Sequence, residues 1–166
     1  MATRSGIAVL VVFGLAALAF ADSSCGPGDG AGADGDFDFD GGGVSTCDGV
    51  VVVETASGNA QVPGDTSLIG SDASASCAMR EGSGDDQAVL VLQAALVRCN
   101  GQSVTPDGDY GAQTTQAVMN VQQQHGITAD GAYGPATLEV MAWPSTGSSG
   151  CVTGVSAGST VVGEAP

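Results

Sequence analysis

The chain has 166 residues, enough for one small domain with appendages. It contains no lysine and only three arginines against 18 acidic residues, which gives a formal net charge of −15. This charge argues against nucleic acid and anionic membrane surfaces as partners, because phosphate binding needs clustered cations. Aromatic residues make up 4 % of the chain, so a core must be built mainly from valine, leucine and alanine.

The first 21 residues have the pattern of an export signal peptide. Arg4 supplies a short positive region, residues 7–20 are almost wholly apolar, and Ala19-Phe20-Ala21 fits an A-x-A cleavage site. The apolar run is too short for a strong transmembrane span. We therefore expect residues 1–21 to direct export, and the remaining chain to be secreted into an oxidising, extracytoplasmic compartment.

Five cysteines follow this signal, and an odd number leaves one without an intramolecular partner. Cys25 is the natural outlier, since bacterial lipoproteins acylate a cysteine close to the signal cleavage site. The preceding Asp22-Ser23-Ser24 departs from the usual lipobox, so acylation of Cys25 stays open. The others are expected to form two disulfides in one of three pairings. They are Cys47, Cys77, Cys99 and Cys151.

Residues 22–46 are predicted to be a disordered acidic linker, because they consist mostly of Gly, Asp and Ala. Within the linker, Asp36 to Gly41 resembles the opening of a calcium-binding EF-hand loop. Position twelve of such a loop should be a bidentate Glu, and here it is Cys47. We therefore interpret the segment as a tether and predict no metal site and no cofactor.

Residues 47–76 are predicted to form a β-hairpin and a connection. Val50–Val53 is a β-branched run, Ser57-Gly58-Asn59 is a turn, and residues 60–62 form a second short strand. Four consecutive valines do not show which face of the hairpin is buried. Residues 66–76 are polar and are expected to do no more than lead the chain to Cys77.

Three helices are predicted in residues 77–145. The first covers about 87–99 and begins after Asp85 or Asp86, whose carboxylates suit an N-cap. The second covers about 112–125 and ends at Gly126. The third is short, at about 135–141, and is followed by a tail (146–166) that Cys151 attaches and that is otherwise loosely held.

An eight-residue phrase occurs twice, from Asp107 to Thr114 and again 23 residues later from Asp130 to Thr137. Five of its eight positions are identical: Asp, Gly, Tyr, Gly and Thr. Asp-Gly is typical of a turn that contains a positive φ, and the second Gly of each copy falls where an N-cap belongs. The phrase therefore predicts a repeated turn-plus-helix unit, with the tyrosine as an apolar plug.

The stretch from about Met79 to Trp143 resembles the peptidoglycan-binding module known as the PGBD-like three-helix fold. One departure is Val121-Gln122, where most members have Phe before the Gln. The resemblance covers about two fifths of the chain. The motifs that carry it are Leu92-Gln93, Asp107 to Thr114, Gly126-Ile127, and Asp130 to Thr137.

This resemblance implies a mainly α protein: a compact three-helix bundle, preceded by a short hairpin and the acidic linker. It also implies binding to peptidoglycan, through glycan or stem peptide, in a shallow groove of polar and aromatic side chains. The tyrosines and the tryptophan are candidates either for ligand contact or for core packing. Gln93 and Gln122 are expected to hydrogen-bond the loop backbone. The candidate ligand-binding residues are Asp109, Tyr110, Gln113, Tyr133 and Trp143.

Catalysis finds little support in the residues. His125 is the only histidine, no Cys-x-x-Cys spacing suggests zinc, and no Gly-x-Ser-x-Gly elbow occurs. We therefore expect a non-enzymatic, cell-wall-associated protein that binds peptidoglycan. The alternative is a scaffold that recognises a secreted wall hydrolase or a receptor without binding glycan directly, and the last-ranked possibility is a module without a ligand.

Overall fold

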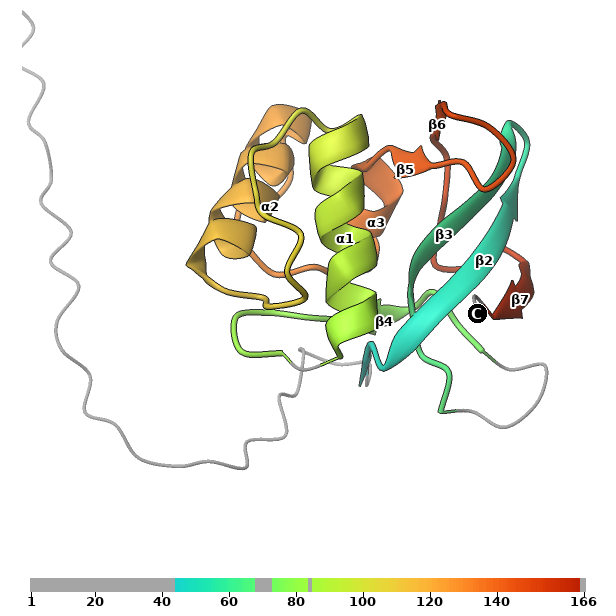
Figure 1. Cartoon of the computed structure of the whole chain (residues 1–166), viewed down its shortest axis with the longest axis horizontal. Coiled ribbons are helices and arrows are strands. Elements are labelled where there is room, and N and C mark those ends of the chain that lie inside the picture. The colour runs from blue at the N-terminus through green and yellow to red at the C-terminus, as the bar shows by residue number, and fades with distance from the viewer. Residues whose placement is uncertain (1–43, 68–72, 84, 165–166) are drawn as a thin grey trace, which may run out of the picture. The chain divides into compact units, whose positions relative to one another are not determined.

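The computed structural model describes residues 44–67, 73–83 and 85–164 (Figure 1). The expected signal peptide, Cys25, the EF-hand-like segment and the linker up to residue 43 lie outside these residues. The described part contains three helices and seven strands in three small sheets. Helix accounts for 29 % and strand for 26 % of it, so the prediction of a mainly α three-helix bundle is wrong. No helix among these residues is long and apolar enough to cross a membrane.

The predicted hairpin is present, as β2 (Gly49–Thr55) and β3 (Gly58–Gly64). A third strand, β7 (Val161–Glu164), pairs antiparallel with the other edge of β2, which gives the sheet order β3-β2-β7. Val51 lies opposite Val62, and both side chains are fully buried. Because side chains alternate between the faces of a strand, Val51 and Val53 point inward together.

The first helix, α1 (Asp86–Cys99), packs against this sheet through β2 and β3 and also contacts α2 (Ala112–His125). Figure 1 shows α1 between α2 and the hairpin, with the short α3 (Pro135–Val140) behind it. A module of about sixty residues buries too little surface to be stable with ease. The sheet supplies the missing apolar surface, and this explains why the hairpin is part of the core and not an appendage. The buried residues of α1 are Ala88, Val89, Leu92, Gln93, Ala95 and Leu96.

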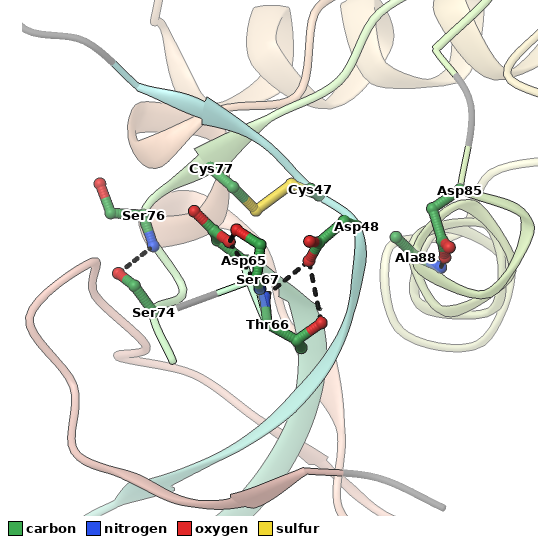
Figure 2. Close-up of a disulfide and its surroundings, with 10 residues drawn as sticks. All are labelled: Cys47, Asp48, Asp65, Thr66, Ser67, Ser74, Ser76, Cys77, Asp85 and Ala88. Carbon is green, nitrogen blue, oxygen red and sulfur yellow. Dashed lines mark hydrogen bonds between the residues drawn. A yellow bond between two sulfur atoms is a disulfide. The ribbon is translucent and has the colours of Figure 1, made fainter. Parts of the chain in front are cut away.

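The ends of the helices agree closely with the sequence prediction. The Asp85 carboxylate accepts a hydrogen bond of 2.8 Å from the backbone N–H of Ala88, as an N-cap should (Figure 2). Gly126 ends α2 in the left-handed conformation, with φ of 70°. Pro135 begins α3, where its missing N–H costs nothing.

Two disulfides link the outer segments to the core. Cys47–Cys77 joins the ends of β1 (Ser45–Thr46) and β4 (Cys77–Ala78), which form a parallel pair, so the predicted linker is ordered at its end. Cys99–Cys151 joins the end of α1 to β6 (Cys151–Val152), which pairs with β5 (Trp143–Pro144). The bridged cysteines are 30 and 52 residues apart. Loops of that length are worth roughly 3–4 kcal/mol each in the chain-entropy description.

Polar side chains surround the Cys47–Cys77 bridge and hold the start of the 66–76 connection (Figure 2). The Asp48 carboxylate accepts hydrogen bonds from the backbone N–H and the hydroxyl of Thr66, at 2.6 and 2.9 Å. The Asp65 carboxylate accepts bonds from the backbone N–H and hydroxyl of Ser67. Hydrogen bonds from the hydroxyls of Ser45 and Ser67 lower the pKa of Asp65. Asp65 is therefore stabilised as a carboxylate although it is buried.

The expectation of a loosely held tail is wrong for the described residues. Val152 and Val155 are 4 % and 1 % exposed, and β7 continues the sheet beside β2. Within β7, Val161 packs against the core while Val162 is 49 % exposed. The single cysteine of the tail gave no indication that a strand follows it.

We expect Val161→Ala to lower the free energy of unfolding by about 1 kcal/mol, because it removes partly buried methyl groups. Val162→Ala changes strand propensity in the same way but removes exposed atoms, so its effect should stay within about 0.5 kcal/mol. Urea titrations of both variants measure the difference. Equal effects would show that β7 does not contribute to the core.

Candidate functional site

The first copy of the repeated phrase is held by the buried side chain of Gln93 from α1. Its Oε1 accepts the backbone N–H groups of Asp107 and Gly108, at 2.9 and 3.0 Å. Its Nε2 lies 2.9 Å from Asp107 Oδ1, 3.0 Å from the Asp109 carbonyl and 3.0 Å from Thr114 Oγ1. A buried amide must find partners, and this one finds them all in a single turn. The predicted bonding of Gln93 to the loop is confirmed.

The second copy repeats this arrangement around Gln122 of α2. The Gln122 Oε1 accepts the N–H of Gly131 at 2.9 Å. Its Nε2 lies 2.7 Å from Asp130 Oδ1, 2.9 Å from the Ala132 carbonyl and 3.1 Å from Thr137 Oγ1. Each helix thus fixes the turn that begins the next helix, and the repeat in the sequence is a repeat of this clamp.

The Asp-Gly step of each phrase has the predicted backbone. Gly108 and Gly131 have φ of 82° and 73°. At Gly131 a Cβ atom would also lie 2.7 Å from Cγ2 of Thr115, which is too close for any real contact. Position 131 therefore requires glycine for two reasons: its positive φ, and the lack of room for a Cβ atom.

The three aromatic candidates, Tyr110, Tyr133 and Trp143, are fully buried. Tyr110 donates a 2.9 Å hydrogen bond from its hydroxyl to the carbonyl of Gly131, which links the first turn to the second. The Tyr133 and Trp143 rings make an edge-to-face contact with centroids 6.0 Å apart. Trp143 Nε1 donates to the Leu138 carbonyl at 3.1 Å. Burial raises the pKa of both tyrosines. All three rings therefore pack in the core.

The equivalent tyrosines of the two phrases differ in one respect. The Tyr133 hydroxyl is buried and has no hydrogen-bond partner in the described part of the chain, whereas that of Tyr110 is bonded. The backbone of Tyr133 is instead paired with Met79, through bonds of 2.9 and 2.8 Å. The carbonyl of Tyr110 likewise accepts the backbone N–H of Gly82 at 3.0 Å, so both turns are anchored by the main chain and only the first is anchored by its tyrosine hydroxyl as well.

A hollow of about 470 Å³ lies between the loop after α1 and the exposed face of α2. This volume is within the range of about 300–1,000 Å³ that is usual for small-ligand sites. None of its lining residues is charged or aromatic, and we call it the amide groove. Its lining consists of Gly101, Gln102, Ser103, Ala112, Gln113, Gln116, Ala117 and Asn120.

The side chains of the amide groove are connected by hydrogen bonds. Gln116 Nε2 donates to Asn120 Oδ1 at 3.0 Å, and Asn120 Nδ2 donates to Gln102 Oε1 at 3.1 Å. Gln102 Nε2 in turn donates to the carbonyl of Asn100 at 3.0 Å. Asn100 caps α1 and also bonds the backbone of Ala142 in both directions. The groove wall is therefore tied to the end of α1 and is not a set of free side chains.

The sequence-predicted site residues fall into an exposed group and a buried group. In the exposed group, Gln113 lines the amide groove, while Asp109 lies in the turn before α2 and does not line it. The remaining candidates are the three buried rings. Sequence analysis missed Gln102, Ser103, Gln116 and Asn120. A signal was present, because Gln113, Gln116 and Asn120 have the spacing that places side chains on one face of a helix.

Comparison with known proteins finds a family match for the helical part of the chain. Residues 85–141 match the family model described as "Putative peptidoglycan binding domain", and this segment belongs to that family. A relative from Mycobacterium tuberculosis (strain ATCC 25618 / H37Rv), named N-acetylmuramoyl-L-alanine amidase CwlM, is 40 % identical over 67 residues. The match covers 40 % of this chain and 16 % of that protein. No solved structure matches the chain.

The two tyrosines provide a matched test of the clamped turns. Tyr110→Phe leaves the buried Gly131 carbonyl without its partner, so we expect a loss of about 1–2 kcal/mol in the free energy of unfolding. Tyr133→Phe removes a hydroxyl that has no partner, so its effect should be near zero or stabilising. Chemical denaturation followed by circular dichroism measures both. A larger loss for Tyr133→Phe would contradict the assignment.

The first clamp also predicts a dependence on pH. A hydrogen bond from the Gln93 amide, and then one from the backbone N–H of Asp109, hold the pKa of Asp107 below its ordinary value of 3.8. A carboxyl with a lowered folded pKa contributes stability above its unfolded pKa and loses it as the pH falls through the folded one. We therefore expect the stability difference between wild type and Asp107→Asn to shrink below about pH 4.

Unfolding titrations at several pH values measure this difference. The asparagine side chain retains an oxygen that can accept the hydrogen bond from Gln93, but it has no carboxyl group to titrate. The variant therefore isolates the effect of the Asp107 charge. A difference that stays constant through the acid range would contradict the role of the Asp107 charge.

Proposed function

We propose that this protein binds bacterial cell-wall peptidoglycan through the amide groove, without catalysing a reaction. The observation that carries the proposal is the coincidence of two features in one place. The segment 85–141 belongs to a family described as peptidoglycan-binding, and the amide groove is built from α2 and from the loop that precedes it, within that segment.

The composition of the amide groove supports a binding role. Its amides and its hydroxyl both donate and accept hydrogen bonds, which suits a ligand rich in hydroxyl and amide groups. Gln113 and Ser103 make no side-chain hydrogen bond within the described part of the chain, so they remain available. Asp109, one turn before Gln113 along the chain, extends the polar surface toward the first clamped turn.

The proposal includes an extracytoplasmic location. Two disulfides in a chain of this size are typical of oxidising compartments, which agrees with the export signal expected at residues 1–21. Acylation of Cys25 would hold the protein at a membrane, while the helical domain contacts the wall. The Mycobacterium tuberculosis relative is named as an amidase. A secreted wall hydrolase is therefore a second candidate partner of this protein.

The test is retention on purified peptidoglycan sacculi. We expect the chain to sediment with sacculi, and a Gln113→Ala, Gln116→Ala variant to bind at least about tenfold more weakly, because each substitution removes hydrogen-bonding groups from the groove. Gln124→Ala is the matched control, since Gln124 is an exposed glutamine of the same helix outside the groove. It should bind like wild type.

Two results would contradict the proposal. Failure of the wild-type chain to sediment with sacculi from several bacterial types would exclude direct wall binding and favour recognition of a partner protein. Binding that is equal in wild type and the double variant would place the wall-binding surface outside the amide groove.

A further inference from the structure

The amide groove combines three features that have a common chemical explanation. Its lining is uncharged, it carries primary amides along one wall, and it contains two alanines on the α2 side, Ala112 and Ala117. Ala112 is exposed at the start of α2, whereas Ala117 is 3 % exposed and belongs to the core, so Ala112 supplies the accessible methyl group of the groove.

An acetamido group has matching parts. It presents a methyl group, a carbonyl acceptor and an N–H donor within a few bonds of one another. The exposed methyl of Ala112 can contact the methyl group, while glutamine and asparagine amides can pair with both the carbonyl and the N–H. In peptidoglycan the sugars of the glycan strand carry this group. The stem peptides also contain amide groups and alanine methyls, but they differ from the glycan in carrying free charged groups.

The charges of the molecule point in the same direction. A stem-peptide carboxylate is bound most strongly by Arg or Lys, and no lining residue of the groove is a cation. The formal net charge of −15 repels carboxylates at longer range, and the uncharged lining also offers no carboxylate to a stem-peptide ammonium group. A neutral face of the glycan strand needs no charged partner in the groove and is not repelled by the charge of the protein.

The wall of the groove is already in place before a ligand arrives. The chain of hydrogen bonds from Gln116 through Asn120 to Gln102 fixes the three amides relative to one another. Groups that are held in position lose less conformational entropy on binding than free side chains do. Because these amides are held at fixed positions, they favour a ligand whose polar groups are also held at fixed positions, as they are on a sugar ring.

From these observations, and resting on the proposed function, we infer that the amide groove selects the acetamido-bearing face of the glycan strand rather than the charged stem peptide. The ligand class is a neutral β-linked saccharide with N-acetyl groups. Since the tyrosine and tryptophan rings of the described residues are buried, recognition proceeds by hydrogen bonds and methyl contact, not by stacking on one of these rings.

The experiment is release of the full chain from sacculi by soluble competitors. The tetramer of β-1,4-linked N-acetylglucosamine should release the protein, while the β-1,4-linked glucose tetramer, which carries a hydroxyl in place of each acetamido group, should not. The free stem tripeptide should also fail. Retention should not weaken as the salt concentration rises, because the contacts with the neutral glycan are uncharged and screening only reduces the repulsion between the acidic protein and the stem-peptide carboxylates of the sacculi.

A variant links the result to the groove. Ala112→Leu fills the small apolar surface and should weaken retention by about tenfold, since overfilling a formed site excludes its ligand. Gln124→Leu introduces the same side chain on the same helix outside the groove and should bind normally. Circular dichroism establishes that both variants are folded.

Any other result of these experiments overturns a specific part of the inference. Release by the tripeptide, by both tetramers or by neither would overturn acetamido selection while sacculus binding, and thus the proposed function, stands. Normal retention of Ala112→Leu would remove the groove from the inference. Absence of sacculus binding in the wild type would overturn the proposed function and this inference together.

Discussion

Two buried glutamine amides determine the geometry of the helical domain. Gln93 and Gln122 each reach from one helix into the turn that starts the next, and each takes up both donors and acceptors of a single Asp-Gly turn. An amide buried without these bonds would cost more than it contributes, so the glutamine and its turn depend on each other. Tyr110 then joins the two turns through the Gly131 carbonyl. The first of these clamps fixes the start of α2, one wall of the amide groove, while hydrogen bonds from Gln102 to Asn100 and Leu96 hold the loop that forms the other wall.

The sheet solves a problem that the helices cannot solve alone. Alanine and valine fill much of the helical interior, and such side chains bury little apolar surface each. Packing β2 and β3 against α1 extends the core, and β7 covers the open edge of β2. The two disulfides then restrict the segments before and after the matched domain. On this view the added strands stabilise the domain and leave the groove face of α2 open.

Local signals in the sequence predicted local structure well and tertiary packing poorly. Asp85, Gly126 and Pro135 mark helix ends because caps act within one turn. Alternation could not show the inward face of Val50–Val53, since all four residues are apolar, and pairing of β7 with β2 spans about a hundred residues without any local mark. The clamp by Gln93 was predictable because a buried amide needs partners. The groove was not, because the spacing of Gln113, Gln116 and Asn120 shows only that they share a helix face, and the position of the Gln102 loop makes that face the wall of a hollow.

The central claim is that the amide groove is the surface that contacts the wall. Nuclear magnetic resonance of the labelled full chain, titrated with soluble peptidoglycan fragments, tests this claim most directly. The account predicts that amide shifts concentrate at residues 101–103 and 112–120, with Gln113 and Gln116 side-chain signals among them. Shifts that concentrate on the β3-β2-β7 sheet, while the groove signals stay in place, would contradict it.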